Sequence, residues 1–432
     1  MNSVWVKDIN KPKFPALNKD INTDILIIGG GMAGILCAYM LKQAGADCLL
    51  TEAKEICGGI TQNTTAKITL QHGLIYHSLL QRFGKENAFL FYKAQKEACE
   101  KIWELCADIE CDYEQRDFFV YSLDDREKLF NELSALKLLG READFCARTE
   151  LPFKTAGAVR VKGQAQFHPL KFAYASSKDL PIYENTKVLE LAPHKAFTEN
   201  GIITWKKLIV ATHFPIDNKH GSYFLKLYQH RSYVLALKGA QQFNGMYVDH
   251  SQTGLSFRPY KDLLLLGGGG HRTGKNGGNW KELADFAKRY YPSAKIVSKW
   301  ATQDCMSLDG VPYIGRYSKN TPDMFVATGF NKWGMSSSMV SALILADMVQ
   351  GRDNPYAKVF DPSRSILTPQ LAVNAFESAL GVLTPTAPRC PHLGCALKYN
   401  PHEHSWDCPC HGSRFDENGK LLDNPATDDK SM

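Results

Sequence analysis

The most apolar stretch of the chain lies near its N-terminus and predicts a strand, a turn and a helix. Residues 24–28, "DILII", have the continuous apolar character of a buried parallel strand, and an apolar-faced helix follows to about residue 44. "AGADCLLTEA" then gives a turn and a second strand that ends at Glu52. Residues 24–41 are long enough for a membrane span, but three consecutive glycines argue against one. The pattern predicts a βαβ unit.

Helical and strand patterns continue along the rest of the chain. Apolar residues at helical spacing predict helices over about residues 74–106, 125–140, 280–290 and 335–351. Alternating or continuous apolar runs predict strands at residues 111–123, 206–213 and 323–330, with shorter strands within 181–211 and 229–270. Residues 353–370 are rich in Pro, Asp and Ser, so we expect a linker there and a domain boundary near residue 362.

The composition is that of a soluble globular protein with two or three domains. The chain has 432 residues, of which 44% are hydrophobic and 22% charged. The net charge of +6 is small for this length, so we expect no nucleic-acid partner. The first 20 residues lack the basic start and apolar core of a signal peptide. We therefore expect a cytoplasmic protein without a membrane span.

A glycine motif directly after the first strand predicts a dinucleotide site. Gly29, Gly31 and Gly34 form the pattern G-x-G-x-x-G, and Glu52 follows at the end of the next strand. Gly29 permits a tight turn, Gly31 lets the backbone approach a pyrophosphate, and Gly34 lets helix and strand pack closely. The helix N-terminus would face the phosphate charge, and Glu52 would accept hydrogen bonds from a ribose. The motif alone does not separate NAD from FAD.

Five further stretches resemble the FAD-dependent oxidoreductases of the D-amino-acid oxidase and glycine oxidase superfamily. They are "EICGGITQNTTAKIT" (55–69), "ENTKVLEL" (184–191), "LIVATH" (208–213), "LDGVPYIGR" (308–316) and "ATGFNKWGMSSS" (327–338). In the third, His213 stands in place of the family's glycine. The resemblance covers roughly residues 22–355 and implies FAD as the cofactor.

The resemblance also implies which residues hold FAD. The last stretch looks like the loop and helix start beneath the flavin, where amides and the helix dipole would meet the negative charge of a reduced flavin. The backbone of Val188 would meet the adenine. The implied set is Gly29, Gly31, Met32, Ala33, Gly34, Glu52, Ala53, Gly59, Ile60, Thr61, Val188, Gly329, Asn331, Lys332, Trp333, Gly334 and Met335.

The same resemblance implies how residues 1–361 are divided and what chemistry they perform. The FAD domain would comprise about residues 22–84, 153–217 and 301–355, and a substrate domain about residues 85–152 and 218–300. The family removes a hydride from a carbon that bears an amine. Arg258 could bind a substrate carboxylate, and His271 and Arg272 could line the same pocket. A surface ion pair and a turn are the alternative explanations of these residues.

Four of the twelve cysteines crowd into the C-terminal region, and the other eight are scattered and predicted to be small buried residues. The four are Cys390, Cys395, Cys408 and Cys410. With His392 and His411 they give C-x-H and C-x-x-H, which together make a four-ligand set. Structural zinc, unconnected thiols and a Rieske [2Fe–2S] centre compete as explanations. Zinc leaves two cysteines unexplained, and the symmetry of the two loops argues against unconnected thiols.

"CPHLGC" and "CPCHGS" closely resemble the signature of Rieske [2Fe–2S] domains, over about residues 390–426. The resemblance implies that Cys390 and Cys408 bind one iron, and that His392 and His411 bind the other. Neutral imidazoles in place of two thiolates lower the negative charge of the cluster and raise its potential.

The resemblance extends to residues around the ligands. Cys395 and Cys410 match the pair that a disulfide joins in cytochrome bc-type Rieske proteins. Ser413 matches a serine that donates a hydrogen bond to the cluster sulfur, whereas Phe415 stands where many members have a tyrosine donor. We therefore expect a middling potential.

The predicted Rieske domain, residues 362–432, is short. Only about 28 residues separate Pro362 from Cys390, and "LAVNAFESALGVL" within them favours a helix over strands. We expect a trimmed β domain whose stability depends on the FAD module.

These observations predict an α/β protein: a Rossmann-like FAD-binding domain with an inserted mixed-sheet substrate domain, and a small C-terminal β Rieske domain. The sequence also resembles bacterial FAD-dependent oxidoreductases that carry a C-terminal Rieske domain. We expect a dehydrogenase that takes a hydride from a small amine or amino-acid-like substrate and passes single electrons through the [2Fe–2S] cluster to an unidentified acceptor. Alternatives are an electron-transfer or redox-sensing protein without small-molecule turnover, and a zinc-stabilised flavoprotein.

Overall fold

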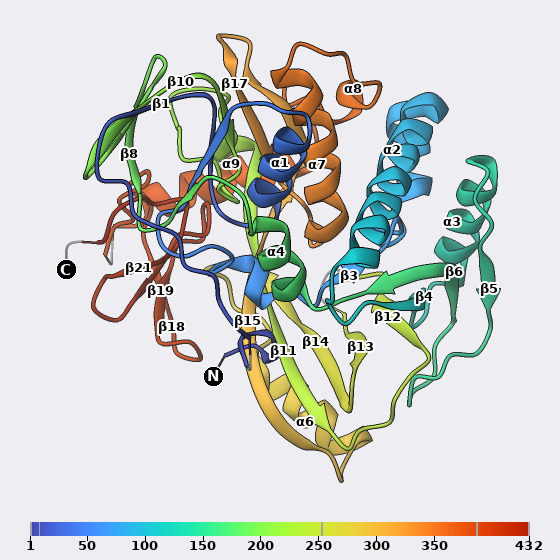
Figure 1. Cartoon of the computed structure of the whole chain (residues 1–432). Helices are drawn as coiled ribbons and strands as arrows, with labels where there is room; N and C mark the ends of the chain where they lie inside the picture. The colour runs from blue at the N-terminus through green and yellow to red at the C-terminus, as the bar shows by residue number, and fades with distance from the viewer. Residues whose placement is uncertain (1, 8, 252–253, 386–387, 431–432) are drawn as a thin grey trace.

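The residues that the structure describes form three β-sheets, two large and one small (Figure 1). The computed structural model describes residues 2–7, 9–251, 254–385 and 388–430. Among the helices of these residues, none is long and apolar enough to cross a membrane.

The first sheet is mostly parallel and contains the predicted βαβ unit. Its strands, in spatial order, are β16 (Tyr313–Ser318), β17 (Thr321–Thr328), β10 (Gly201–Val210), β1 (Ile21–Ile28), β2 (Cys48–Thr51) and β7 (Ile182–Tyr183), with β8 (Val188–Ala192) and β9 (Lys195–Thr198) beside β10. Ile28 at the end of β1 lies opposite Thr51 of β2 and Val210 of β10. The carboxyl ends of these strands therefore meet at one edge, where ligands bind in open α/β sheets.

Helices lie against both large sheets. They are η1 (Val4–Val6), α1 (Met32–Gln43), η2 (Ile60–Asn63), α2 (Ile75–Asp108), α3 (Arg126–Leu138), α4 (Pro169–Ser177), α5 (Tyr223–Lys226), α6 (Trp280–Tyr290), α7 (Gly334–Val349), α8 (Ala357–Phe360) and α9 (Pro369–Leu383). Of these, α1, α7 and α8 pack against the first sheet, whereas α3 and α6 pack against the second large sheet. Helices α1 and α2 both pack against α7 (Figure 1). Ile27 of β1, Leu36 of α1, Phe91 of α2 and Met339 of α7 are fully buried in the largest core, which these helices share with the first sheet.

The second sheet is mixed, as predicted for the substrate domain. In spatial order its strands are β15 (Lys295–Ser307), β11 (Leu227–Lys238), β14 (Leu263–Arg272), β13 (Ser256–Tyr260), β12 (Gly245–Asp249), β4 (Glu114–Ser122), β6 (Gly157–Gln166) and β3 (Lys67–Ile68), and β5 (Asp144–Cys146) pairs with β6. β12 and β4 run parallel, whereas β11 is antiparallel to both of its neighbours. Strand β6 falls outside the residue ranges predicted for that domain, and the division into domains stays a prediction.

The C-terminal sheet is small and antiparallel, and α9 precedes it. Its strands are β18 (Lys398–Asn400), β19 (Ser405–Asp407), β20 (Arg414–Asp416) and β21 (Leu421–Asp423). Figure 1 shows these red strands at the side of the molecule that carries β8. The helix predicted from "LAVNAFESALGVL" is present as α9, with Thr368 capping its N-terminus.

The predicted elements are present, with shifts of a few residues at their ends. Helix α2 bends at Gly84, whose φ of +75° interrupts the helical pattern. The segment predicted as a linker is more ordered than expected, because α8 lies within it and buries Phe360 completely. Of the eight scattered cysteines, all but the half-buried Cys146 are buried thiols.

Candidate functional site

A large cavity of about 970 Å³ lies where all three sheets meet. Its lining includes the predicted glycine loop after β1, the end of β10, the strands β11 and β15, and residues 421–427 of the C-terminal sheet. Of the residues predicted to hold FAD, all line this cavity except Gly34.

The glycines after β1 shape the first end of the cavity. Gly29 has a φ of +111°, and a Cβ there would lie 2.5 Å from the carbonyl oxygen of Ala211. A Cβ at Gly34 would lie 1.9 Å from the carbonyl oxygen of Gly29, so Gly34 serves helix–strand packing and not the cavity. A Cβ at Gly31 would meet only the Thr61 hydroxyl, at 3.6 Å. The open space at Gly31 therefore leaves room for a ligand at the N-terminus of α1.

Glu52 is fixed by backbone amides beside these glycines. Its two carboxylate oxygens accept hydrogen bonds from Gly30 N–H at 2.7 Å and Lys54 N–H at 2.9 Å. Burial nevertheless raises the pKa of Glu52 above its usual value. Each oxygen has further acceptor capacity, so the side chain can still accept bonds from ribose hydroxyls.

The loop before α7 forms the other end of the cavity. Asn331 and Lys332 both have positive φ angles, of 51° and 73°. The Asn331 side chain holds this turn, because it accepts from Ser307 N–H at 2.9 Å and donates to the Gly329 carbonyl at 2.6 Å. The turn brings the N-terminus of α7, at Gly334, to the cavity.

Several charged cavity residues were not predicted from the sequence, and two of them, Asp304 and Lys67, have strongly shifted pKa values. Burial raises the pKa of Asp304 to about 6 and lowers the pKa of Lys67 to about 7. Both line the cavity. The signal for Asp304 was present, since "ATQDCMS" places one carboxylate in an otherwise uncharged strand end. Perturbed groups of this kind cluster at functional sites.

The substrate-binding role predicted for Arg258 does not fit its position. Arg258 is fully buried and does not line the cavity. Its guanidinium donates to the carbonyls of Thr65 and Phe167 and to the Gln166 side chain. All three nitrogens are thus used within the protein, and Arg258 instead holds Thr65 at the cavity wall.

His271 and Arg272 also lie away from the main cavity. His271 stacks on Tyr233 with ring centroids 5.8 Å apart, and it lines a second hollow of about 520 Å³. Arg272 donates to the carbonyls of Pro409 at 3.2 Å and Cys410 at 3.0 Å. Both residues end β14 next to the C-terminal domain, so a shared substrate pocket with Arg258 is excluded by position.

The four predicted cluster ligands lie together in two loops. The thiols of Cys390 and Cys408 are hydrogen-bonded to each other, and this interaction lowers the pKa of Cys390 below its usual value. The rings of His392 and His411 are 5.0 Å apart between centroids. Two sulfur and two imidazole donors are the set that a Rieske centre requires.

The histidine nitrogens support this assignment. His392 Nδ1 and both ring nitrogens of His411 are buried without a hydrogen-bond partner. Burial lowers the pKa of His392 to about 4 and that of His411 to about 3, so both rings are neutral at pH 7. Asn218 Oδ1 lies 3.0 Å from His392 Nε2, and this contact leaves Nδ1 as the free lone pair. The residues present therefore fit a [2Fe–2S] cluster.

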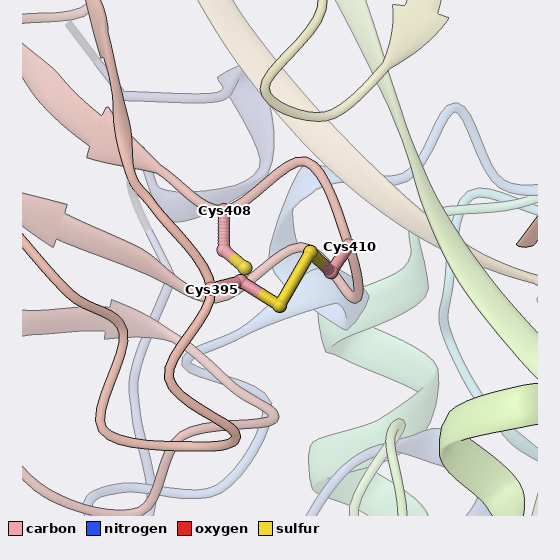
Figure 2. A group of neighbouring side chains, drawn as sticks. All are labelled: Cys395, Cys408 and Cys410. Carbon is pink, nitrogen blue, oxygen red and sulfur yellow. A yellow bond between two sulfur atoms is a disulfide. The ribbon is translucent and has the colours of Figure 1, made fainter. Parts of the chain in front are cut away.

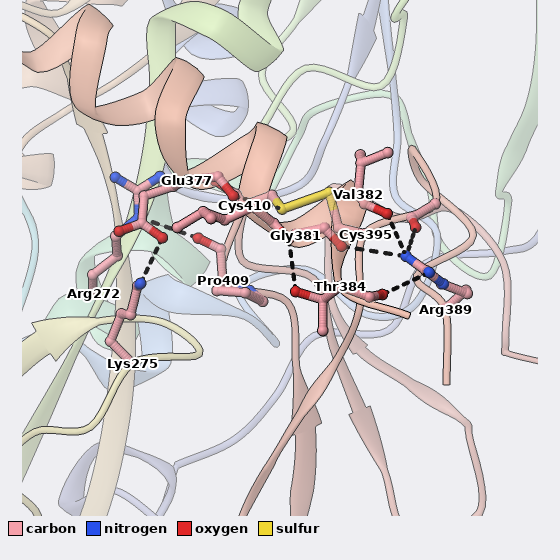
Figure 3. The surroundings of a disulfide bond; sticks show 12 residues. Arg272, Lys275, Glu377, Gly381, Val382, Thr384, Arg389, Cys395, Pro409 and Cys410 are labelled. Atoms are coloured by element: carbon pink, nitrogen blue, oxygen red, sulfur yellow. Dashed lines mark hydrogen bonds and ion pairs between the residues drawn. A yellow bond between two sulfur atoms is a disulfide. The ribbon is translucent and has the colours of Figure 1, made fainter. Parts of the chain in front are cut away.

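A disulfide joins the two loops, as the resemblance implied. It links Cys395 and Cys410, and the Cys408 sulfur lies within 4.8 Å of both (Figure 2). Helix α9 packs on this disulfide, because a Cβ at Gly381 would lie 2.3 Å from the Cys410 sulfur. Arg389 closes the end of α9 by donating to the carbonyls of residues 381, 382 and 384 (Figure 3).

Strands β11 and β15 separate the cavity from the cluster loop. Side chains alternate along a strand, and Ser232 and Asp304 face the cavity. Gln229 and Gln303 face the opposite side. A Cβ at Gly412 would lie 2.3 Å from Gln229 Cβ, and Gln303 Nε2 donates to the Gly412 carbonyl at 2.9 Å. One layer of backbone therefore lies between the two candidate redox sites.

A buried ion network holds the C-terminal sheet on β11. Arg231 of β11 donates to Glu403 Oε1 at 2.8 Å, and Tyr233 donates to the same oxygen at 3.0 Å. Arg414 donates to Glu403 Oε2 at 3.0 Å and to Asp423 Oδ2 at 2.9 Å. Burial would raise the pKa of Glu403, but the two guanidinium groups hold it at about 2. The arginine and Glu403 side chains are at most 7% exposed.

Comparison with known proteins identifies both parts of the chain. Residues 24–348 match the family described as FAD dependent oxidoreductase, and residues 364–431 match the Rieske [2Fe-2S] domain. YhfW of Bacillus subtilis, named as a Rieske 2Fe-2S iron-sulfur protein, is 33% identical over 98% of this chain and 95% of its own length.

More distant relatives share the larger part. Gamma-glutamylputrescine oxidoreductase of Escherichia coli is 22% identical over 87% of this chain and 96% of its own length. The crystal structure of glycine oxidase from Geobacillus kaustophilus superposes with a TM-score of 0.68 at 17% identity, covering 80% of this chain and 99% of that one. At this identity the structural likeness shows the fold.

Proposed function

Because the chain belongs to the FAD-dependent oxidoreductase family and carries a Rieske [2Fe–2S] domain, we propose that it is a dehydrogenase coupled to one-electron transfer. A small amine or amino-acid-like substrate would give a hydride to FAD, and single electrons would leave through the cluster to an external acceptor. FAD supplies two-electron hydride chemistry, and the cluster supplies one-electron transfer.

The observation that carries this proposal is the shared wall of β11 and β15. Asp304 on one face lines the FAD cavity, and the neighbouring Gln303 on the other face binds the loop that follows His411. A protein that only stored a cluster for stability would not need the cluster loop at this wall. The arrangement supports direct electron transfer between the two cofactors within one chain.

Named residues would hold each cofactor. Gly29 N–H donates to the Thr51 carbonyl at 2.8 Å, so Gly29 would shape the turn. The amide of Gly31 at the N-terminus of α1 would bind the FAD pyrophosphate, Glu52 would bind the ribose, and the N-terminus of α7 at Gly334 would face the flavin ring. The cluster would be held by two cysteines and two histidines, namely Cys390, Cys408, His392 and His411. These roles rest on the fit of the cavity and of the orphaned imidazole nitrogens.

Asp304 is the residue to which we assign proton handling. An ammonium group must lose its proton before its carbon can give up a hydride, because the nitrogen lone pair stabilises the developing positive charge. A carboxylate with a pKa of about 6 is suited to accept that proton near neutral pH. The names of the amine- and glycine-oxidising relatives support an amine or amino acid as the substrate class.

Anaerobic addition of small amines and amino acids to the purified protein tests the proposal. A substrate should bleach the flavin absorbance and then produce the EPR signal of a reduced Rieske cluster, whose average g is below that of all-thiolate clusters. Bleaching by dithionite but by no amine or amino acid would favour a redox protein without turnover. A metal assay with zinc and no iron would favour the zinc-stabilised alternative.

A further inference from the structure

We infer that residues 421–427 of the Rieske domain form part of the FAD-binding site, so that FAD binding and docking of the cluster domain stabilise each other. The inference rests on the placement of FAD proposed above. The Rieske domain would then contribute residues to an FAD-binding site that is otherwise formed by the FAD-dependent oxidoreductase part of the chain.

The segment closes the nucleotide end of the cavity. Its lining residues are Leu421, Leu422, Asp423, Asn424, Ala426 and Thr427. The neighbouring wall is formed by residues 186–188, and Thr186 N–H donates to the Glu52 carbonyl at 2.9 Å. The segment therefore adjoins the place proposed for the ribose and adenine of FAD, which agrees with the position of red β21 near β8 in Figure 1.

Side chains from both domains fix the segment there. Asn424 Nδ2 donates to the carbonyls of Thr212 at 2.7 Å and Phe214 at 3.1 Å. From the other side, Lys187 Nζ donates to the Thr427 carbonyl at 2.5 Å. Thr212 and Lys187 line the same cavity. The segment is thus attached to cavity residues at two points, on either side of Ala426.

The segment is also attached to the cluster loop. Ala426 N–H donates to Ser413 Oγ at 3.0 Å. The Ser413 hydroxyl is hydrogen-bonded to the Cys390 sulfur, and the Ser413 carbonyl accepts from Cys408 N–H at 2.8 Å. One residue therefore connects the FAD cavity to both cysteine ligands of the cluster.

This connection has a thermodynamic consequence. A ligand that contacts the docked segment binds the docked state more tightly than an undocked one, and so favours docking. By reciprocity, docking of the segment strengthens FAD binding by the same factor by which FAD strengthens docking, so a variant that undocks the segment weakens FAD binding.

The first test compares Asn424→Ala with Asn418→Ala in the full-length, cluster-loaded protein. FAD is removed, and its dissociation constant is measured by fluorescence titration. Asn424→Ala leaves the Thr212 carbonyl without its donor and removes one of the two bonds to the Phe214 carbonyl, which still accepts from the Thr212 hydroxyl at 2.7 Å. We expect FAD to bind about 10-fold more weakly. Asn418 lies in the exposed turn before β21 and outside the cavity, so Asn418→Ala should bind as the wild type does. Equal dissociation constants for Asn424→Ala and the wild type would overturn the inference.

A second measurement needs no variant. Hydrogen–deuterium exchange of the wild-type protein is followed with and without FAD. We expect FAD to slow exchange of the Ala426 amide and its neighbours, while amides in the turn at residues 416–419 exchange at the same rate. Unchanged exchange in 421–427 would count against the inference. Neither measurement uses a substrate or electron transfer, so either result can arise whether the proposed dehydrogenase activity stands or fails.

Discussion

The side-chain amide of Gln303 donates a hydrogen bond to the backbone carbonyl of Gly412 at 2.9 Å. Gln303 is fully buried, and its own carbonyl oxygen accepts from the Thr273 hydroxyl at 2.9 Å. Gly412 follows the proposed iron ligand His411, and Asp304, which follows Gln303, lines the FAD cavity. A single side chain thus joins the wall of one redox site to the loop of the other.

Replacing Gln303 with leucine should slow electron transfer from flavin to cluster. Leucine has a similar volume but leaves the buried Gly412 carbonyl without a donor, at a cost of about 1–3 kcal/mol, so the cluster loop should shift. After anaerobic photoreduction of the flavin, we expect cluster reduction to be several-fold slower than in the wild type. Ser298→Ala, which removes a hydrogen bond to Asn2 from the same strand, is the matched control. Equal rates in Gln303→Leu and the wild type would contradict direct transfer through this wall.

The ion network should make domain docking sensitive to acid. The folded pKa of Glu403, about 2, lies below its usual 4.5, so the folded protein binds this proton less tightly than the unfolded chain. Ionised Glu403 therefore contributes roughly 3 kcal/mol to the free energy of unfolding. This contribution is fully present above about pH 5 and is lost as the pH falls toward 2. Urea unfolding between pH 3 and pH 7 measures it.

The variant Glu403→Gln should flatten this part of the pH profile and lower stability at pH 7. It removes the carboxylate that Arg231 and Arg414 share and, among the described residues, leaves Arg231 only Asp423, at 3.7 Å. Glu199→Gln, in the exposed turn between β9 and β10, is the control. An unchanged profile in Glu403→Gln would mean that the network does not govern acid stability.

Two glycine variants should separate folding from cofactor binding. A methyl group at Gly34 would collide with the Gly29 carbonyl, so Gly34→Ala should destabilise the protein by about 1–3 kcal/mol or more. A methyl group at Gly31 has room in the protein but enters the space proposed for the pyrophosphate, so Gly31→Ala should fold and bind FAD more weakly. Thermal unfolding and flavin content distinguish the two. Full flavin content in Gly31→Ala would argue against the proposed pyrophosphate position.

Ser413 should tune the cluster potential. Its hydroxyl is bonded to the Cys390 sulfur, and such bonds stabilise the more negative, reduced cluster. Ser413→Ala should therefore lower the midpoint potential in an EPR-monitored titration. The wild-type value should fall within the class range of roughly −150 to +300 mV but below its top, because Phe415 offers no hydroxyl donor. A midpoint at the top of the range would refute this reading.

Asp304→Asn should slow the reduction of the flavin by substrate and raise the stability of the protein. Burial raises the folded pKa of Asp304 to about 6 from its usual 3.8, so the charged form costs the folded protein up to about 3 kcal/mol. Without flavin, the free energy of unfolding of Asp304→Asn should exceed that of the wild type. This difference should be full above about pH 6 and disappear near pH 4, as denaturant unfolding measures. With a reducing amine, the same variant should lose most of its rate of flavin reduction at pH 7. Unchanged reduction would remove Asp304 from the proposed chemistry.

The parts of the site that the sequence predicted are local. Gly29, Gly31 and Gly34 act through strand, turn and helix geometry within a few residues of themselves, so their spacing was sufficient. The same holds for the two cluster loops, where each loop contributes one cysteine and one histidine within four residues. Periodicity also predicted α9, because its hydrophobic spacing belongs to a single helix.

The parts that could not be predicted depend on contacts between distant segments. Arg258 was assigned to substrate because an arginine in a strand carries no sign of its partners, and those partners, Thr65 and Phe167, lie about 90 to 190 residues away in sequence. The placement of residues 421–427 at the nucleotide end depends on Asn424 reaching Thr212, which is equally remote.

Arg272 at the end of β14 donates to the carbonyls of Pro409 and Cys410, and so binds the backbone of the cluster loop directly. Because of this contact, we expect that the two domains on either side of the predicted boundary near residue 362 do not unfold independently. We expect heating to give one cooperative transition in which flavin release and cluster bleaching coincide. It also follows that the last 70 or so residues are unsuited to transplantation onto another flavoprotein, because their structure is completed by the surface of this one.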